Sequence, residues 1–374
     1  MLNILRKGST QPDSKIIAIL RLIRSENIGP KTFHNLVKYY GSPEVALENL
    51  PEFIKRSNSK IKIASKESAL QEIEALDKIG AGLIAYTGSE YSYLLRTIDN
   101  FPPILSYKGD LSLMQKQCAA IVGARNCSIS GKQIATKIAQ ELSYAGVVIV
   151  SGLARGIDTA AHIASKPNTI SVIAGGIDNI YPPENHKLYQ EISENGLLMA
   201  ELPVGSVPMA RHFPQRNRII SALSLATIVI EASLNSGSLI TAQFALEQNR
   251  EVFACPGFPL DPRCKGSNKL IKEGAQLLES SEDILSFINS ESSILKDEIS
   301  YIKTAPVYRH VDESLLNEQN RAIILSLLSA HPVTIEDIAE QSSLPYSIIL
   351  TILLEYEIQE RVASIGKNRF VLNF

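Results

Sequence analysis

The chain has 374 residues, a formal net charge of −2 at pH 7, 45% hydrophobic residues and 20% charged residues. These values are typical of a globular protein of two or three domains and exclude a fibrous or strongly basic protein. Because the whole chain is slightly acidic, any affinity for nucleic acid has to come from a local basic cluster.

Neither the cysteines nor the hydropathy pattern indicates a metal site or a membrane segment. The four cysteines lack CxxC spacing, so we expect reduced thiols, no metal and no disulfide framework. The apolar run within 1–7 is too short for a signal peptide, and no stretch is long enough for a transmembrane helix. These features predict a cytoplasmic protein that does not associate with a membrane.

Residues 1–75 predict a small helical domain. Apolar residues recur at helical spacing over 14–50, interrupted by the hinge Gly29-Pro30. Two amphipathic helices joined in this way resemble the helix-hairpin-helix unit, whose turn can bind DNA phosphate. Plain helical bundles use the same hinge, so DNA binding here stays open. A polar helix over 55–75 leads out of the domain.

Residues 76–288 alternate apolar strands with helices, which predicts an α/β core with a doubly wound parallel sheet. Ligands in that fold lie beyond the carboxyl ends of the strands, and several of the ends here carry glycine. A helix is predicted over 132–144. The predicted strands cover 82–86, 119–123, 147–150, 169–174, 228–230 and 251–254.

The C-terminal part predicts a linker and a winged-helix-like domain. Residues 289–318 are polar with little periodicity, which indicates a linker. Residues 319–374 predict three helices and a hairpin around Gly366-Lys367. The third helix, 348–356, has no Arg or Lys between Ser347 and Gln359. It lacks the basic face that major-groove reading needs, so we favour a docking or weak binding role over transcription regulation.

The stretch 211–218 holds three arginines, a histidine and a phenylalanine in eight residues. Pro214 suits the first turn of a helix, which places the arginines beside free backbone N–H groups and the positive end of a helix dipole. Phe213 offers an aromatic face on which a base can stack. A solvated basic turn with a buried Phe explains the stretch about equally well when it stands alone. The candidate binding residues here are Arg211, Phe213, Arg216, Asn217 and Arg218.

Three further turns at strand ends favour anion binding. The segment 123–125 closes a buried strand, 151–162 puts two glycines and an arginine before a helix, and 235–242 supplies small hydroxyl residues. Several such turns at one sheet edge indicate a phosphate site more strongly than any one of them. The candidate residues are Gly123, Arg125, Gly152, Arg155, Gly156, Ser236, Gly237 and Ser238.

No enzyme motif stands out. The sequence has no G-x-G-x-x-G after a strand, no P-loop and no G-x-S-x-G elbow, which leaves hydride transfer and ATP hydrolysis without support. Catalysis by Asp158 and His162 is possible, although Asp158 also suits a helix cap. Structural capping accounts for Glu201 and Glu231. We therefore assign no catalytic residue and expect no cofactor.

Six sequence runs together resemble the DNA-processing protein A family (DprA, also called Smf). The resemblance covers roughly 82–287 and extends to the flanking domains. It implies an N-terminal sterile-alpha-motif-like (SAM-like) helical domain, an extended Rossmann core and a C-terminal winged-helix-like domain. The runs are Val122–Arg125, Ser151–Asp158, Ala174–Asp178 with Tyr181-Pro182, Phe213–Ile220, Ser236–Ala242 and Arg250–Gly257.

The resemblance implies a non-enzymatic homodimer that binds single-stranded DNA and loads the recombinase RecA onto incoming or exposed strands in natural transformation and recombination. It assigns the DNA pocket to the Gly-x-Arg turn and to the Phe-x-x-Arg-Asn-Arg segment. This sequence departs from some relatives at Pro183, where they carry a basic residue. Either His186 or Lys187 substitutes for it, or one DNA contact is missing. The segment between His162 and Ile170 is also short.

The competing class is an enzyme that splits nucleoside monophosphates into a base and ribose phosphate. Such Rossmann-type phosphoribohydrolases carry a Gly-Gly-x-Gly-Thr-x-x-Glu loop. The equivalent strand end here, 235–242, contains no glutamate, which disfavours this class.

Overall fold

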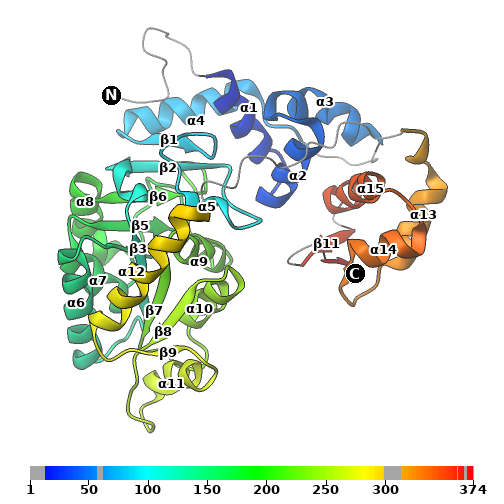
Figure 1. Cartoon of the computed structure of the whole chain (residues 1–374). Helices are drawn as coiled ribbons and strands as arrows, with labels where there is room; N and C mark the ends of the chain where they lie inside the picture. Colours follow the sequence, from blue (N-terminus) through cyan, green and yellow to red (C-terminus); the bar gives the residue numbers. More distant parts are fainter. Residues whose placement is uncertain (1–12, 57–61, 299–312, 360, 366–368, 374) are drawn as a thin grey trace.

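The computed structural model describes residues 13–56, 62–298, 313–359, 361–365 and 369–373. Figure 1 shows a helical N-terminal domain above a sheet flanked by helices, with a small C-terminal module beside the N-terminal domain. Within the described residues, no helix combines the length and hydropathy needed to cross a membrane.

The N-terminal domain consists of α1 (Ser14–Ile23), α2 (Pro30–Tyr40), α3 (Pro43–Arg56) and α4 (Lys66–Lys78). Pro30 opens α2, where its missing N–H costs nothing, and Gly41 ends α2 with a φ of +87°. The predicted helix over 55–75 is only partly correct, because α4 begins at Lys66 with Ser65 as its cap. Residues 57–61 lie outside the described residues.

The core is a mixed sheet of nine strands in the order β1-β2-β6-β5-β4-β3-β7-β8-β9. In this spatial order, each pair of neighbouring strands between β6 and β9 is parallel, which agrees with the predicted core. β1 and β2 pair antiparallel at one edge of the sheet. The strands β2, β6 and β9 were not predicted. The bounds are β1 (Gly82–Ala85), β2 (Ile104–Gly109), β3 (Cys118–Gly123), β4 (Val148–Ser151), β5 (Thr169–Ile173), β6 (Leu197–Ala200), β7 (Ala226–Ile230), β8 (Glu251–Ala254) and β9 (Gln276–Leu277).

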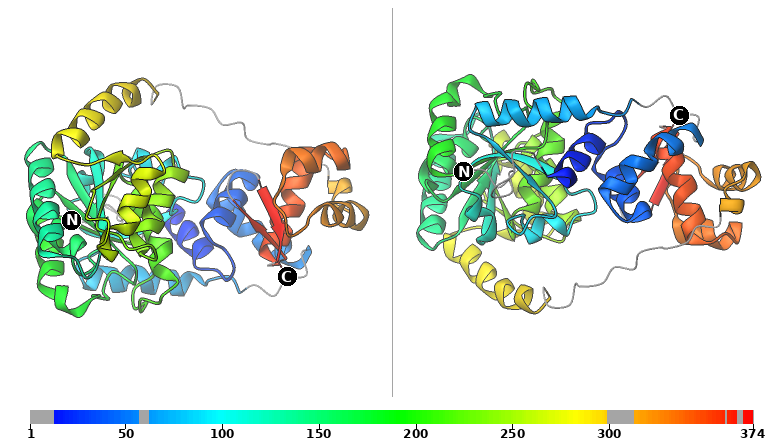
Figure 2. Two further views of the ribbon diagram at one scale, coloured as in Figure 1. Left: turned by 90° about the horizontal axis from the view of Figure 1, so that it is seen from below. Right: turned by 90° about the horizontal axis from the view of Figure 1, so that it is seen from above.

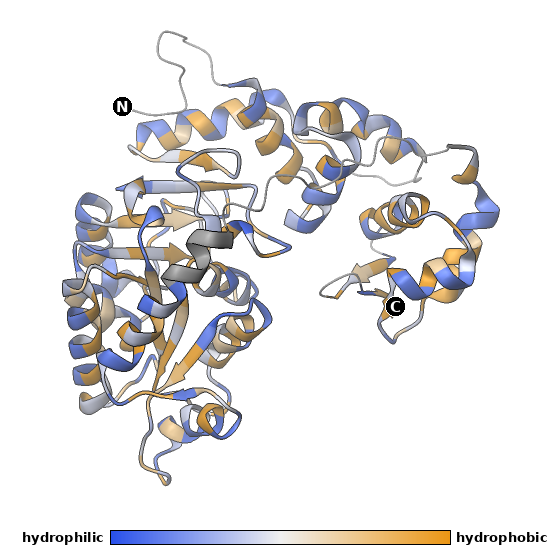
Figure 3. Ribbon diagram, viewed as in Figure 1, coloured by the Kyte–Doolittle hydropathy of each residue, from blue (hydrophilic) through white to orange (hydrophobic). Residues whose placement is uncertain are grey.

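Helices cover both faces of the sheet, which is why most of its parallel strands are short, largely apolar runs. Ile121 of β3 packs with Ile138 and Ile284 on one face, whereas the next residue, Val122, packs with Ile219 on the other. Figure 3 shows hydrophobic residues along the strands and on the inner sides of the helices. The larger helices are α6 (Ile129–Tyr144), α7 (Ile157–Ser165), α8 (His186–Asn195), α9 (His212–Ala222), α10 (Gly237–Glu247), α11 (Lys265–Lys272) and α12 (Ser281–Glu298).

The shorter helical elements lie in the connections between these strands and helices. They are α5 (Tyr93–Arg96), η1 (Leu111–Gln115), η2 (Pro183–Asn185), η3 (Pro262–Cys264) and η4 (Glu313–Leu315).

The linker starts later than the sequence predicts. α12 continues to Glu298, past the predicted start at 289, because the buried side chains of Ile284 and Ile288 anchor the helix on the sheet and its polar continuation extends from that anchor. Residues 299–312 lie outside the described residues.

The C-terminal module has a winged-helix architecture, as predicted. It contains α13 (Glu318–Leu327), α14 (Ile335–Ser342) and α15 (Tyr346–Ile358), with β10 (Val333–Thr334) pairing with the hairpin of β11 (Val362–Ser364) and β12 (Arg369–Leu372). Thr334 caps α14 through a capping box with Asp337. The predicted hairpin turn at Gly366-Lys367 lies outside the described residues.

The winged module docks on the N-terminal domain through α15. Leu354 and Ile358 belong to the same hydrophobic cluster as Phe33 and Leu36 of the N-terminal helices. The amide of Asn35 donates to a carboxylate oxygen of Glu357 at 3.5 Å. Figure 2 shows the module against the N-terminal helices in two views. The third helix of the winged fold is therefore covered by the N-terminal helices on the side that carries Leu354 and Ile358.

Candidate functional site

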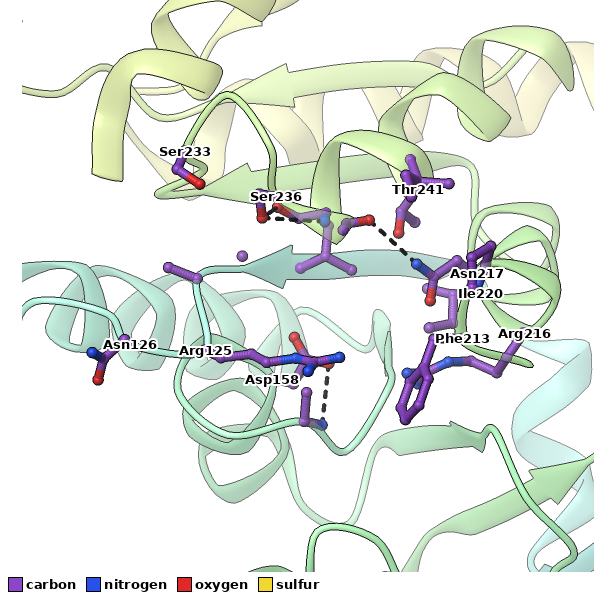
Figure 4. A pocket seen from close by; sticks show the side chains of 18 of the residues that line it. Arg125, Asn126, Asp158, Phe213, Arg216, Asn217, Ile220, Ser233, Ser236 and Thr241 are labelled. Carbon is purple, nitrogen blue, oxygen red and sulfur yellow. Dashed lines mark hydrogen bonds between the residues drawn. The ribbon is translucent and has the colours of Figure 1, made fainter. Parts of the chain in front are cut away.

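A cavity of about 600 Å³ opens where β3, β4 and β7 end and α9 and α10 begin. Figure 4 shows side chains from these elements around it. Of the candidate residues from the sequence, it is lined by Gly123, Arg125, Phe213, Arg216, Asn217, Ser236, Gly237 and Ser238. Turns that are far apart in the sequence thus meet at one edge because parallel strands end on the same side of a sheet.

Phe213 is the aromatic centre of this cavity. It lies in the first turn of α9, where Pro214 also sits as predicted. The guanidinium carbon of Arg125 is 5.2 Å from the centroid of the Phe213 ring, and that of Arg216 is 6.0 Å away. One ring thus carries two cations within the range of a cation–π contact.

Arg125 is an exposed cation of the cavity. Its side chain makes neither a hydrogen bond nor an ion pair with any other residue that the structure describes, and it contacts the Phe213 ring instead. The guanidinium can therefore turn its N–H groups toward an anion without first losing a carboxylate partner.

Arg216 is a buried cation behind that ring. It is 6% exposed, and its Nη1 donates to the carbonyl oxygen of Val172 at 2.7 Å. Burial lowers the pKa of Arg216 to about 10, against the opposing effect of Asp158. A Cβ added to Gly152 would overlap Nη1, so Gly152 leaves the space that the guanidinium occupies. Gly152 therefore acts through Arg216 and does not itself line the cavity.

Arg218 lies elsewhere. It is 6% exposed, donates from Nη1 to the carbonyl oxygen of Asn100 at 2.7 Å, and forms an ion pair with Glu201. It is not among the residues that line the cavity. These contacts give Arg218 a structural role, because they tie α9 to Glu201, the residue that follows β6.

Arg155, Gly156 and Arg211 are also outside the cavity wall. Arg155 is exposed and pairs with Glu184 of η2, and Arg211 is an exposed residue just before α9. Gly156 has a φ of +77°, and a Cβ there would lie 2.6 Å from the carbonyl oxygen of Arg125. Gly156 thus lets the turn after β4 approach the turn that carries Arg125.

Asp158 and His162 hold the turn after β4 in place. Oδ2 of Asp158 accepts from the backbone N–H of Gly152 at 3.1 Å and of Ala154 at 3.3 Å, and burial raises its pKa. Nε2 of His162 accepts from the N–H of Leu153 at 3.4 Å, and burial lowers the pKa of this fully buried ring to about 3. Both side chains thus support this turn. Asp158 lines the cavity and does not cap α7, because the cap residue of that helix is Gly156 and no side chain bonds there.

The start of α10 forms the opposite wall. The hydroxyl of Ser236 accepts from the N–H of Ser238 at 3.3 Å, and the two hydroxyls are 2.7 Å apart. The amide of Asn217 donates to the carbonyl oxygen of Gly237 at 3.3 Å, which ties α9 to α10. The wall combines hydroxyl donors with a helix N-terminus, a combination suited to phosphate.

Sequence reasoning left several polar lining residues out of the candidate set, namely Asn126, Ser233, Thr241 and Arg263. Asn126 follows Arg125 directly, and Arg263 lies in η3 after β8, paired with Asp261 at 2.7 Å. The position of Arg263 after the end of β8 was the signal that the sequence offered.

Glu231 accepts from the N–H of Ser128 at 2.8 Å at the start of α6, which fits the capping role expected of it. No group of three His, Cys, Asp or Glu residues suited to a metal occurs in the described ranges.

Comparisons with known proteins agree with this architecture. The family model for the DNA recombination-mediator protein A matches residues 82–289. A DprA-like N-terminal HHH domain matches residues 13–75, and a DprA winged helix domain matches 314–366.

Several relatives and structures are similar to the chain. The DNA processing protein DprA of Bacillus subtilis is 46% identical over 209 residues, 55% of this chain and 70% of that protein. Protein Smf of Escherichia coli is 35% identical over 280 residues, 73% of this chain and 72% of that protein. The X-ray structure of DprA from Streptococcus pneumoniae has a TM-score of 0.61 at 33% identity, with 72% of this chain and 96% of that chain covered.

A further structure concerns the single-stranded DNA binding mode of DprA from Helicobacter pylori. It has a TM-score of 0.51 at 33% identity and covers 57% of this chain and 96% of that chain. Since the core model spans more than half of the residues and two flanking models match on either side, the chain belongs to the DNA recombination-mediator protein A family, DprA/Smf.

Proposed function

We propose that this chain is a DNA-processing protein that binds single-stranded DNA at the cavity around Phe213. The observation that carries the proposal is the exposed guanidinium of Arg125 beside an aromatic ring, in a cavity whose other wall is a helix N-terminus with two serine hydroxyls. Phosphate would bind to Arg125 and to the start of α10, and a base would contact Phe213.

The remaining candidates enter the proposal in different ways. Arg216 and Asn217 shape and charge the wall, Arg155 and Arg211 supply charge outside the cavity, and Gly152 and Gly156 position the arginines. Arg218 is left out of the proposed DNA contacts because its guanidinium is committed to Glu201 and Asn100.

The single-stranded DNA binding mode of the Helicobacter pylori relative, which is 33% identical to this chain, supports the choice of ligand. We further propose that the protein has no enzymatic activity, forms homodimers and loads RecA onto the bound strand in transformation or recombination. Family membership supports these roles. RecA filament assembly on single strands precoated with a single-strand-binding protein would test the loading role, with and without this chain.

Binding itself is tested by fluorescence anisotropy with labelled single-stranded and duplex oligonucleotides over a range of salt. We expect Arg125→Ala to weaken single-strand binding regardless of sequence and to flatten the salt dependence, because one phosphate contact is lost. The matched control is Arg361→Ala, an exposed arginine 5.0 Å from the ring of Tyr356 in the winged module. Equal affinity of Arg125→Ala and the unsubstituted protein would overturn the assignment of the cavity.

The phosphoribohydrolase alternative predicts release of free base from nucleoside monophosphates. Asp158, which lines the cavity, accepts from the N–H groups of Gly152 and Ala154, and Glu231 accepts from the N–H of Ser128, so both carboxylates serve the turns. Chromatographic detection of free base after incubation with the four common monophosphates would favour the enzyme.

A further inference from the structure

Tyr181 extends the aromatic surface of the cavity beyond its wall. It follows β5 on the loop that leads to η2, and its ring centroid is 5.7 Å from that of Phe213, with the two planes inclined at 64°. Tyr181 is 47% exposed. It is not among the residues that line the cavity itself. The ring therefore lies outside the cavity, in edge contact with the residue at its centre.

The loop that carries Tyr181 is braced by the loop before α9. The N–H of Gly176 donates to the carbonyl oxygen of Ser206 at 2.8 Å, and the N–H of Gly205 donates to Oδ1 of Asp178 at 2.8 Å. A Cβ added to Gly175 would lie 2.8 Å from the carbonyl oxygen of Ser206. Two loops this close hold the position of an exposed ring that would otherwise be free to move.

One exposed aromatic side chain is ordinary on a protein surface, whereas several exposed apolar side chains beside a cavity indicate an interaction site. The loop before α9 also exposes Val207 and Met209, at 66% and 43%. The hydroxyl of Tyr181 makes no hydrogen bond with another described residue, so the side chain is held by its packing on Phe213.

A positive charge lies on the same side of the cavity. Arg155 pairs with Glu184, three residues after Tyr181, and both side chains are more than half exposed. Such an exposed pair is weak in water, so a phosphate can compete with Glu184 for the guanidinium. Because Gly156 packs against the backbone of Arg125, the two arginines stand on adjoining turns.

We propose that Tyr181 is a second base platform, which stacks the base of the nucleotide next to the one at Phe213, with Arg155 near the phosphate of that nucleotide. This inference rests on the proposed function and specifies its ligand: a strand of at least two unpaired nucleotides. A duplex is a poor ligand for this arrangement, because its bases are already stacked and paired.

The experiment measures the affinity of short oligothymidylates of increasing length. For strands too short to reach beyond the cavity, we expect Tyr181→Ala to bind like the unsubstituted protein. For longer strands we expect Tyr181→Ala to be weaker by about 5- to 150-fold, the range that one stacked base supplies. Tyr181→Trp should retain the affinity, and Tyr144→Ala, at an 81% exposed tyrosine of α6, should leave every affinity unchanged.

An abasic scan tests the contact directly. In a strand just long enough to reach Tyr181, one abasic position should weaken binding to the unsubstituted protein but leave binding to Tyr181→Ala unchanged, because the lost base and the lost ring belong to one contact. If Phe213→Ala weakens binding while Tyr181→Ala matches the unsubstituted protein at every length, the second platform is wrong and the proposed function stands. If the unsubstituted protein binds no single strand, both fall.

Discussion

The guanidinium of Arg216 occupies the space that a side chain on Gly152 would need, although the two residues come from different strand–helix connections. Arg216 lies in α9, and Gly152 follows β4. The bond from Nη1 to the carbonyl oxygen of Val172 then fixes the arginine against β5. Gly152, which the sequence suggests as a phosphate-binding residue, thus leaves the space that the buried guanidinium of Arg216 occupies.

Gly152→Ala should therefore destabilise the fold and weaken single-strand binding together. The added methyl group overlaps Nη1, and overpacking of this kind costs about 1–3 kcal/mol. Chemical denaturation measures the free energy of unfolding, and anisotropy measures binding. Gly237→Ala is the control for stability, because a Cβ at that position meets no atom within 4 Å. An unchanged free energy of unfolding for Gly152→Ala would contradict the close approach.

Arg218→Ala should lower the free energy of unfolding more than it lowers the affinity for DNA. The substitution leaves the partly buried carboxylate of Glu201 without its ion pair, and breaking such a pair costs about 3 kcal/mol. Denaturation of Arg218→Ala and of the double variant with Glu201→Gln measures the effect, and the double variant should recover part of the loss. Normal stability combined with lost DNA affinity would instead make Arg218 a DNA contact.

Acidification should destabilise the protein through the fully buried His162 and the half-buried His34. Burial lowers the pKa of His162 to about 3 and that of His34 to about 4, whereas both titrate near 6.5 in the unfolded chain. Between these values the unfolded state binds more protons, so stability rises with pH up to about 7 and falls as the pH drops below 6.5. From pH 7 to pH 5 each histidine should cost about 2 kcal/mol.

The free energy of unfolding of the unsubstituted protein and of His162→Asn at the two pH values tests this dependence. The variant should lose stability more gently on acidification, since one of the two titrating groups is gone. Identical pH slopes for the two proteins would show that His162 is not buried in its neutral form.

Reversing the charge of Glu357 should loosen the winged module. Burial raises the pKa of Glu357 against the effect of Lys31, and the ammonium of Lys31 contacts the hydroxyl of Ser364 in the wing. Glu357→Lys places two cations together, so we expect faster hydrogen exchange in α2 and α15. Combining it with Lys31→Glu restores opposite charges and should slow the exchange again. If the double variant exchanges as fast as the single one, the charge pair does not hold the domains.

The convergence of the turns at one sheet edge could be predicted, because buried strands separated by helices form a parallel sheet whose carboxyl ends face one way. The roles of individual arginines could not. Arg216 and Arg218 are two residues apart on a helix, so they point in widely different directions, and the packing of α9 decides which one reaches the cavity wall. Arg263 was missed because η3 has no periodicity to mark it.

The strands at the antiparallel edge, β2 and β6, could not be predicted from the sequence for a related reason. β6 is a run of only four residues, all buried, which periodicity alone cannot distinguish from part of a helix. β2 pairs with it across a long separation in the chain, and short local patterns do not encode such pairing.

The apolar character of α15 has a consequence for how the domains can be separated. One side of the helix packs inside the winged module through residues such as Ile352, and the other covers the N-terminal helices through Leu354 and Ile358. A chain cut before the winged module would expose apolar surface on α2, and the isolated module would expose the matching side of α15. Both fragments should tend to self-associate, so the two terminal domains behave as one cooperative unit.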